Sequence, residues 1–143
     1  MVCGLDGAPA DTACRPSAET PLHTALYELD DEIGAVFHTH SVAATVLSMR
    51  ASKTLEIGGF EMQKAISGVT THESTLSLRV FDNTQDMAAL AEHLRESWSS
   101  ITVPGFLIAG HGLYAWGRDI DEAERHIEGF EFLFECLLQA GSA

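Results

Sequence analysis

The stretch Ala35–Ser41 (AVFHTHS) begins with three apolar residues and continues with two histidines separated by one residue. Such a run is typical of a buried strand. Side chains of a strand alternate between its two faces, so His38 and His40 point to one side and Thr39 points to the other. The sequence therefore predicts two imidazoles, placed as ligands of one metal ion, at the end of a strand.

Ser41 is followed by the sequence VAATVL, residues 42–47, which predicts a helix that Ser41 caps. A helix N-terminus carries unpaired backbone N–H groups and a partial positive charge. This end repels a bare cation but favours an oxyanion that forms on a substrate. The segment after the two histidines therefore suits chemistry in which the substrate gains negative charge.

A third histidine strengthens the evidence for a metal, because a His-x-His pair alone is often a chance surface feature. His111 lies between two glycines, directly after a second apolar strand, Phe106–Ala109. The glycines allow a sharp turn that brings the imidazole inward. Three imidazoles with an open position are the ligand set of a catalytic zinc, whereas structural zinc sites are closed and usually contain thiolates. We expect one Zn²⁺ per chain at His38, His40 and His111.

Apolar residues recur at helical spacing in three further segments. They are residues 20–33, with Thr20 as the cap and Pro21 in the first position, residues 87–98, and residues 119–137, where Asp119 and Glu122 resemble a capping box. The last helix should close the core with the stripe Ile120, Ala123, Ile127, Phe130, Phe134 and Leu137.

Short apolar or alternating runs predict strands at 55–57, 76–81 and 106–109, and a further strand or extended loop at 113–117. Residues 60–66 predict a short helix or turn, and residues 1–15 an irregular beginning. Strands that alternate with helices indicate an α/β or α+β fold in which helices cover a central sheet. Residues 1–143 are expected to form one domain, and the strand order stays open.

The composition agrees with a folded chain that has no nucleic-acid partner. The 143 residues are 45% hydrophobic and contain no low-complexity run, which is enough for one domain with a core. Asp and Glu number 21 against 8 Lys and Arg, which gives a formal charge of -13. Phosphate backbones are bound by clustered basic residues, and none are seen here. The acidity is interpreted as a solvated surface.

The cysteines Cys3, Cys14 and Cys136 have neither zinc-finger spacing nor that of a redox pair, which fits a reducing compartment. The sequence shows no basic leader with an apolar core, and no apolar stretch reaches the roughly 18 residues that span a bilayer. We expect a cytoplasmic protein with no membrane partner. The other histidines, His23, His72, His93 and His126, are expected to be surface or second-sphere residues.

Several motifs together resemble a known superfamily. The segments Pro16–Glu19 (PSAE), His38–Ser41 (HTHS) and His111-Gly112 resemble, in this order, the class II aldolase/adducin superfamily of metal-dependent sugar-phosphate enzymes. Within it the chain is similar to the methylthioribulose-1-phosphate dehydratases of methionine salvage. That similarity lies in Glu61–Lys64 (EMQK), His111–Gly117 (HGLYAWG) and Phe130–Glu135 (FEFLFE).

The resemblance implies a class II aldolase-like central sheet, Zn²⁺ on the three histidines, and a homotetramer with active sites at subunit interfaces. Dehydratases of this kind carry their catalytic acid/base at the position of Glu61, whereas the aldolases carry their base at that of Glu19. We therefore expect Glu61 to be catalytic and Glu19 to contact the substrate or act as a second base. The alternative for Glu19 is an acid that favours the dipole of its helix. Ser17 is expected to hold the substrate phosphate, with Arg15 a weaker candidate.

The implied reaction removes water from 5-methylthioribulose 1-phosphate and gives 5-methylthio-2,3-dioxopentyl phosphate. Glu61 would take a proton from C3 and return it to the leaving C4 hydroxyl, a task that favours a carboxyl pKa raised by partial burial. Members of the family have a few tens of residues ahead of the position of Met1 that help to hold the phosphate. We therefore expect the chain to be N-terminally shortened and its phosphate affinity to be reduced.

Two other functions stay open. The first is a class II aldolase or epimerase that acts on another phosphorylated ketose with the same metal. The second is a noncatalytic scaffold of the adducin kind. Scaffolds of this kind are expected to lose metal ligands, and the three histidines retained here count against that alternative.

Overall fold

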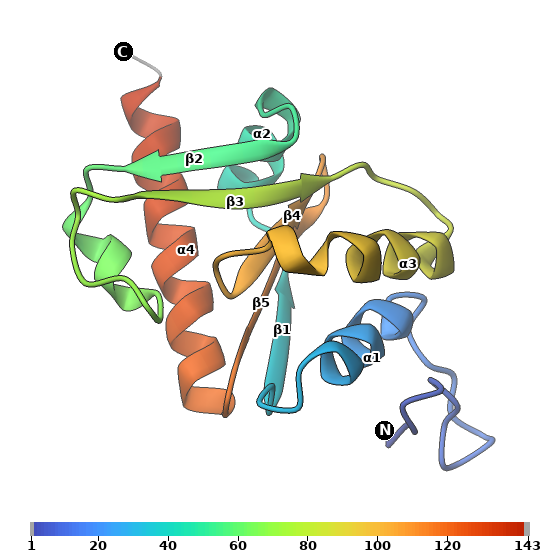
Figure 1. The fold of residues 1–143 in the computed structure, drawn as a ribbon. Coiled ribbons are helices and arrows are strands. Elements are labelled where there is room, and N and C mark those ends of the chain that lie inside the picture. The colour runs from blue at the N-terminus through green and yellow to red at the C-terminus, as the bar shows by residue number, and fades with distance from the viewer. Residues whose placement is uncertain (1, 142–143) are drawn as a thin grey trace.

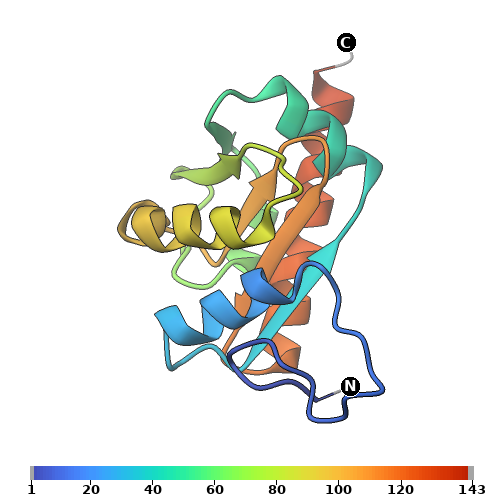
Figure 2. The ribbon, with the colours of Figure 1, turned by 90° about the vertical axis from the view of Figure 1, so that its right-hand side faces the viewer.

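The computed structural model describes residues 2–141 and contains a five-stranded sheet between two layers of helices (Figures 1 and 2). This architecture confirms the predicted layered α/β fold. In chain order the elements are α1 (Thr20–Leu29), β1 (Ala35–Thr39), α2 (Val42–Arg50), β2 (Thr54–Gly58), the 3-10 helix η1 (Glu61–Ala65), β3 (Thr75–Phe81), α3 (Met87–Ser97), the 3-10 helix η2 (Trp98–Ser100), β4 (Gly105–Ile108), β5 (Gly112–Gly117) and α4 (Ile120–Ala140).

The strands are ordered β1-β5-β4-β3-β2, which the sequence left open. All neighbours are antiparallel except β3 and β4, which are parallel and are joined through α3. β1 is an edge strand that pairs with β5, in a register that places His38 opposite Tyr114 and Thr39 opposite Leu113. This pairing brings the end of β1 beside the β4–β5 turn, which carries His111.

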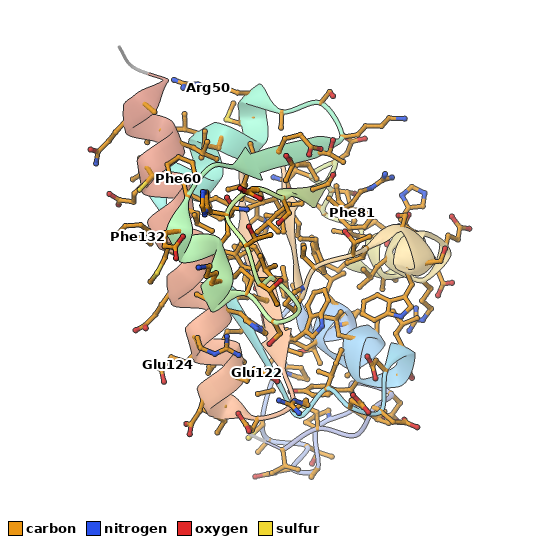
Figure 3. The ribbon with its side chains drawn as sticks, turned by 60° about the vertical axis from the view of Figure 1, so that its left-hand side comes forward. Arg50, Phe60, Phe81, Glu122, Glu124 and Phe132 are labelled. Carbon is orange, nitrogen blue, oxygen red and sulfur yellow. The ribbon has the colours of Figure 1, made fainter. Side chains whose placement is uncertain are left out.

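Each face of the sheet has its own apolar core. Helices α1 and α3 cover one face, where Leu22, Phe106 and Tyr114 are fully buried. Helices α2 and α4 cover the other face, with Leu107 and Phe130 in its core. In Figure 3, Phe60 lies toward α4 and Phe81 toward α3, on these two sides. Because both faces are covered, β4 reads as a continuous apolar run.

The helix ends show which sequence signals held. Ser41 caps α2 by accepting a hydrogen bond from the Ala44 N–H at 2.9 Å, as predicted. Asp119 caps α4 by accepting from the Glu122 N–H at 2.8 Å. The Glu122 carboxylate accepts from the Arg118 N–H at 2.8 Å, so it serves the residue before the cap. The side chain of Glu122 therefore does not close a regular capping box.

Three sequence predictions are wrong: two concern residues of the helices and one concerns a histidine. Thr20 lies inside α1, and Glu19 occupies the cap position without a side-chain hydrogen bond. Ile120 is 63% exposed rather than part of the α4 stripe, because it begins the helix beyond the edge of the core. His126 is buried, since its position on α4 faces β5.

Among the described helices, none combines the length and the apolar character that a bilayer span requires.

His126 joins three segments of the fold. Its Nδ1 donates to the Trp116 carbonyl oxygen in β5 at 2.6 Å, and its Nε2 accepts from the Ser67 N–H at 3.1 Å. The second bond requires an unprotonated Nε2. Burial lowers the pKa of His126, and the hydrogen bond to Trp116 offsets only part of this effect. The folded protein therefore holds His126 in its neutral form.

Replacing Gly117 by Ala should lower the free energy of unfolding. A Cβ at Gly117 would lie 2.5 Å from the backbone nitrogen of Ala123, and backbone has little room to yield. We expect Gly117→Ala to cost about 1–3 kcal/mol in urea denaturation. The control is Gly58→Ala, expected to change stability by less than about 1 kcal/mol, because its methyl group meets only the Thr75 hydroxyl at 3.3 Å. Equal effects of the two changes would show that close packing at Gly117 does not limit stability.

Stability should fall with acidification through His126. The pKa of His126 in the folded protein lies below 6.5, the usual value for histidine, so the unfolded chain binds the extra proton first as the pH falls through that value. The contribution of His126 is then present above about pH 6.5 and is lost as the pH falls. We expect His126→Gln to reduce the slope of unfolding free energy against pH between about 7 and 5, measured by urea denaturation. His93→Gln, at an exposed position, should leave that slope unchanged.

Candidate metal centre

Three imidazoles and one carboxylate converge at the end of β1. His38 lies in β1, His40 directly follows it, His111 lies in the β4–β5 turn, and Glu19 immediately precedes α1. One ligand atom from each of these residues lies within 4.8 Å of all the others. The structure therefore brings together the three histidines that the sequence predicted and adds an acid to them.

The ring nitrogens are spaced as ligands of one small ion. The Nε2 atoms are 2.8 Å apart for His38 and His40, 3.0 Å for His40 and His111, and 3.4 Å for His38 and His111. Two nitrogen ligands of a tetrahedral zinc ion lie about 3.3 Å apart, since each Zn–N bond is about 2.0–2.1 Å long. The spacing therefore fits zinc with only small movements of the rings.

The His38 ring is fixed by two neighbours in β5. Its Nδ1 donates to the Leu113 carbonyl oxygen at 2.8 Å. A carbonyl only accepts, so the proton of the neutral ring is on Nδ1 and the lone pair of Nε2 faces the other ligands. The Tyr114 ring stacks on the imidazole with centroids 4.0 Å apart. Burial lowers the pKa of His38, which keeps the ring neutral and able to bind a cation.

His111 is held by close backbone packing and by α2. Gly110 adopts a φ of 65°, and a Cβ at Gly112 would lie 2.1 Å from the Thr39 carbonyl oxygen, so both glycines are required. The Ser48 hydroxyl oxygen accepts a hydrogen bond from the Gly110 N–H at 3.0 Å. The Thr45 hydroxyl, which donates to the Ser41 carbonyl oxygen at 2.7 Å, also lies 3.2 Å from the His111 carbonyl oxygen. The same helix therefore begins beside His40 and anchors the turn that carries His111.

Glu19 is the carboxylate of the centre. Its Oε1 lies 3.0 Å from Nε2 of His111 and 3.6 Å from Nε2 of His38. The side chains of His38, His111 and Glu19 are 8%, 18% and 26% exposed, so the group is open to solvent on one side. The sequence singled out Glu19 as a substrate contact or second base, but spacing alone gave no sign that it meets the histidines.

The predicted phosphate contacts lie just before Glu19. Ser17 is exposed, and its Oγ accepts a hydrogen bond from the Glu19 N–H at 3.2 Å. This bond fixes the turn that leads into α1. Arg15 is exposed as well. Neither side chain belongs to the group of four ligands.

Glu61 lies apart from the group of four ligands within the described chain. It begins η1, which packs on α4, whereas His38 stacks on Tyr114 on the α1 side of the sheet. Its side chain is 70% exposed and pairs with Lys64 and His72. The Lys64 hydrogen bond lowers the pKa of the Glu61 carboxyl. The expected partial burial and raised pKa are therefore not found in the single chain.

The remaining histidines divide by burial. His72 and His93 are exposed, as predicted, and His126 is buried away from the centre. His23 is partly buried and its ring lies 5.4 Å from that of Tyr114. Burial lowers the pKa of His23, while the negative charge of Glu19 acts in the opposite direction. Tyr114, which contacts both His23 and His38, was missed because an aromatic residue in an apolar strand reads simply as core.

The sequence has close curated relatives. It is 56% identical over 142 residues to a methylthioribulose-1-phosphate dehydratase of Marinobacter nauticus, covering 97% of this chain and 68% of the relative. It is 48% identical over 141 residues to the enzyme of the same name from Xanthomonas campestris pv. campestris, covering 97% of this chain and 65% of the relative. The chain thus spans about two thirds of the length of these relatives.

Solved structures show the same fold. An L-fuculose 1-phosphate aldolase superposes with a TM-score of 0.77 at 21% identity, over 98% of this chain and 61% of that one. A putative aldolase/epimerase/decarboxylase, YgbL from Escherichia coli, gives 0.76 at 22% identity, over 95% and 62%. Residues 1–138 match the family described as the class II aldolase and adducin N-terminal domain. This chain therefore belongs to the class II aldolase and adducin family.

Proposed function

We propose that the protein is a zinc-dependent methylthioribulose-1-phosphate dehydratase. It would convert 5-methylthioribulose 1-phosphate into 5-methylthio-2,3-dioxopentyl phosphate in cytoplasmic methionine salvage. The observation that carries this proposal is the convergence of His38, His40, His111 and Glu19 in a chain 56% identical to a dehydratase. An intact ligand group argues against a scaffold that has lost its metal.

The four side chains fit a catalytic zinc ion. Imidazole nitrogen and carboxylate oxygen are both zinc ligands, and no thiolate lies among the described members of the group. The half-open position of the group leaves one side for a substrate. A bound zinc ion would supply Lewis acidity toward the carbonyl and adjacent hydroxyl of a ketose, which stabilises negative charge on those oxygens.

Glu19 is assigned to the substrate side of this centre. Its Oε1 lies 3.0 Å from the His111 Nε2, a distance at which it can complete a four-ligand set. Together with the three imidazoles, Glu19 would hold the metal ion, and its carboxylate would border the position that water or a ketose takes at a catalytic zinc. The carboxylate then lies beside the hydroxyl groups of the substrate, where it can hold one of their protons.

Glu61 is proposed as the acid/base that moves the proton from C3 to the leaving C4 hydroxyl. The single chain places it away from the four ligands, so we propose that a second copy in a homotetramer provides it. Its side chain is 70% exposed, so a second copy can reach it and displace its surface pairs with Lys64 and His72. Desolvation there would raise the pKa of the carboxyl toward the range that general acid/base catalysis needs.

Ser17 is proposed to contact the phosphate. Its Oγ already accepts from the Glu19 N–H, and the hydroxyl proton stays available for donation to a phosphate oxygen. Glu19 follows two residues later, so the same turn would hold the phosphate and the substrate hydroxyls. Arg15, exposed on this segment, is the second candidate.

The second candidate function is an aldolase that acts on another phosphorylated ketose. The specific observation in its favour is the place of Glu19, because the resemblance puts the aldolase base at this position and the structure puts it beside the histidines. Product analysis distinguishes the two functions. A diketone phosphate supports the dehydratase, and cleavage of a carbon–carbon bond supports the aldolase.

Removing one imidazole should abolish zinc retention. We expect His38→Ala to weaken zinc binding more than about 100-fold, since even the outer partners of metal ligands are worth about 10–100-fold. Competition against a chromophoric chelator measures this affinity. His93→Ala, at an exposed position on α3, is the matched control and should bind zinc like the wild type. Undiminished zinc binding by His38→Ala would exclude the proposed centre.

Substitutions of Glu61 and Glu19 should show which of the two carboxylates carries the proton during dehydration. We expect Glu61→Gln to keep zinc and to lose about 10²–10⁴-fold in the rate of dehydration, because the proton transfer loses its carrier. Diketone formation and zinc content are measured on the same sample.

Mixing metal-deficient His38→Ala with Glu61→Gln subunits should then restore activity to about one quarter, since that share of interfaces joins one intact histidine site to one intact Glu61. Full activity of Glu61→Gln together with an inactive Glu19→Gln would assign the base to Glu19 instead.

A further inference from the structure

Thr39 stands between two proposed metal ligands and points away from both. It lies on the face of β1 opposite His38 and His40, because side chains alternate along a strand. Its Oγ1 donates a hydrogen bond to Oε1 of Glu131 at 2.6 Å. Glu131 belongs to α4, which packs on this face of the sheet. A single contact therefore joins the long helix to the backbone between the two imidazoles.

This contact fixes the end of a strand that the sheet holds from one side only. β1 is an edge strand of the described sheet, and Thr39 is its last residue, so the ladder holds Thr39 from one side through Leu113. Strand ends at an edge lack pairing on their free side. The Thr39–Glu131 bond supplies a second attachment at the point where rotation of the backbone would move both rings.

Burial of the Glu131 carboxylate lowers the free energy of unfolding. Its Oε2 atom is buried and has no hydrogen-bond partner among the described residues. An unsatisfied buried polar atom costs about 1–3 kcal/mol, more when it is charged. Neighbouring α4 positions Leu133 and Phe134 are apolar and fully buried, so an apolar side chain is compatible with this helix. Against this cost, the Glu131 carboxylate makes the hydrogen bond with Thr39.

We propose that Thr39 and Glu131 form a positioning pair that sets the spacing of His38 and His40 and thereby the affinity and geometry of the metal centre. The inference rests on the proposed zinc-dependent function. The bond is short, as expected for a hydroxyl that donates to a carboxylate, and such bonds fix geometry more firmly than neutral ones. Neither side chain touches the ion; each acts through the backbone of β1.

The test removes each partner without changing its size greatly. We expect Thr39→Val and Glu131→Leu each to weaken zinc binding roughly tenfold, in the range known for outer-sphere partners of metal ligands. The double variant should bind no more weakly than either single variant, because both changes remove the same contact. Thr39→Ser keeps the hydroxyl and should bind zinc like the wild type. Glu135→Gln, an exposed acid one turn further along α4, is the matched control.

Two measurements separate positioning from general stability. The unfolding free energy of the metal-free protein should not fall in Glu131→Leu, because the change also removes an unsatisfied buried atom. The visible absorption bands of the fully loaded Co²⁺ protein should shift in Thr39→Val and not in Thr39→Ser. A merely structural pair would lower stability and leave those bands unchanged.

The outcomes distinguish this inference from the proposed function. If the wild-type protein binds zinc and both Thr39→Val and Glu131→Leu bind it equally well with unchanged Co²⁺ bands, the positioning pair is refuted while the zinc centre stands. If the losses in the two single variants add in the double variant, the two residues do not act through one contact and the inference is refuted. If the wild type binds no zinc, the proposed function and this inference fail together.

Discussion

The antiparallel pairing of β1 with β5 is the constraint on which the site depends. His38 and His111 are 73 residues apart in the chain, and this ladder places their Nε2 atoms 3.4 Å from one another. The approach is so close that a side chain at Gly112 would meet the Thr39 carbonyl oxygen at 2.1 Å. The geometry of the candidate metal centre therefore depends first on the register of the backbone and second on the chemistry of the side chains.

The surrounding elements hold the same backbone from several directions. Leu113 orients the His38 ring through its carbonyl, and Ser48 in α2 holds the turn that carries His111 by accepting from the Gly110 N–H. Glu131 in α4 reaches Thr39 from the opposite face of the sheet. Supports on both faces reduce the freedom of the imidazoles before any ion binds, and such preorganisation is what a rigid scaffold contributes to a catalytic site.

Much of the fold and of the ligand set could be predicted from the sequence. Alternation along β1 predicted that His38 and His40 share a face, and Gly110 and Gly112 predicted the turn at His111. These signals are local. The strand order, the arrival of Glu19 and the burial of His126 depend on which distant segments pack together, and no spacing along the chain reports this. The carboxylates show the limit most clearly, because Glu19 meets the histidines whereas Glu61 faces solvent on the other helix layer.

X-ray absorption at the zinc edge of the protein loaded with one equivalent of Zn²⁺ reports directly whether the three histidines bind one ion. We expect three imidazole nitrogens at about 2.0–2.1 Å from the zinc ion and an oxygen in the remaining position. The multiple-scattering pattern of imidazole should correspond to three rings. A shell of oxygens without imidazole scattering, or one that contains sulfur from Cys3, Cys14 or Cys136, would contradict this expectation.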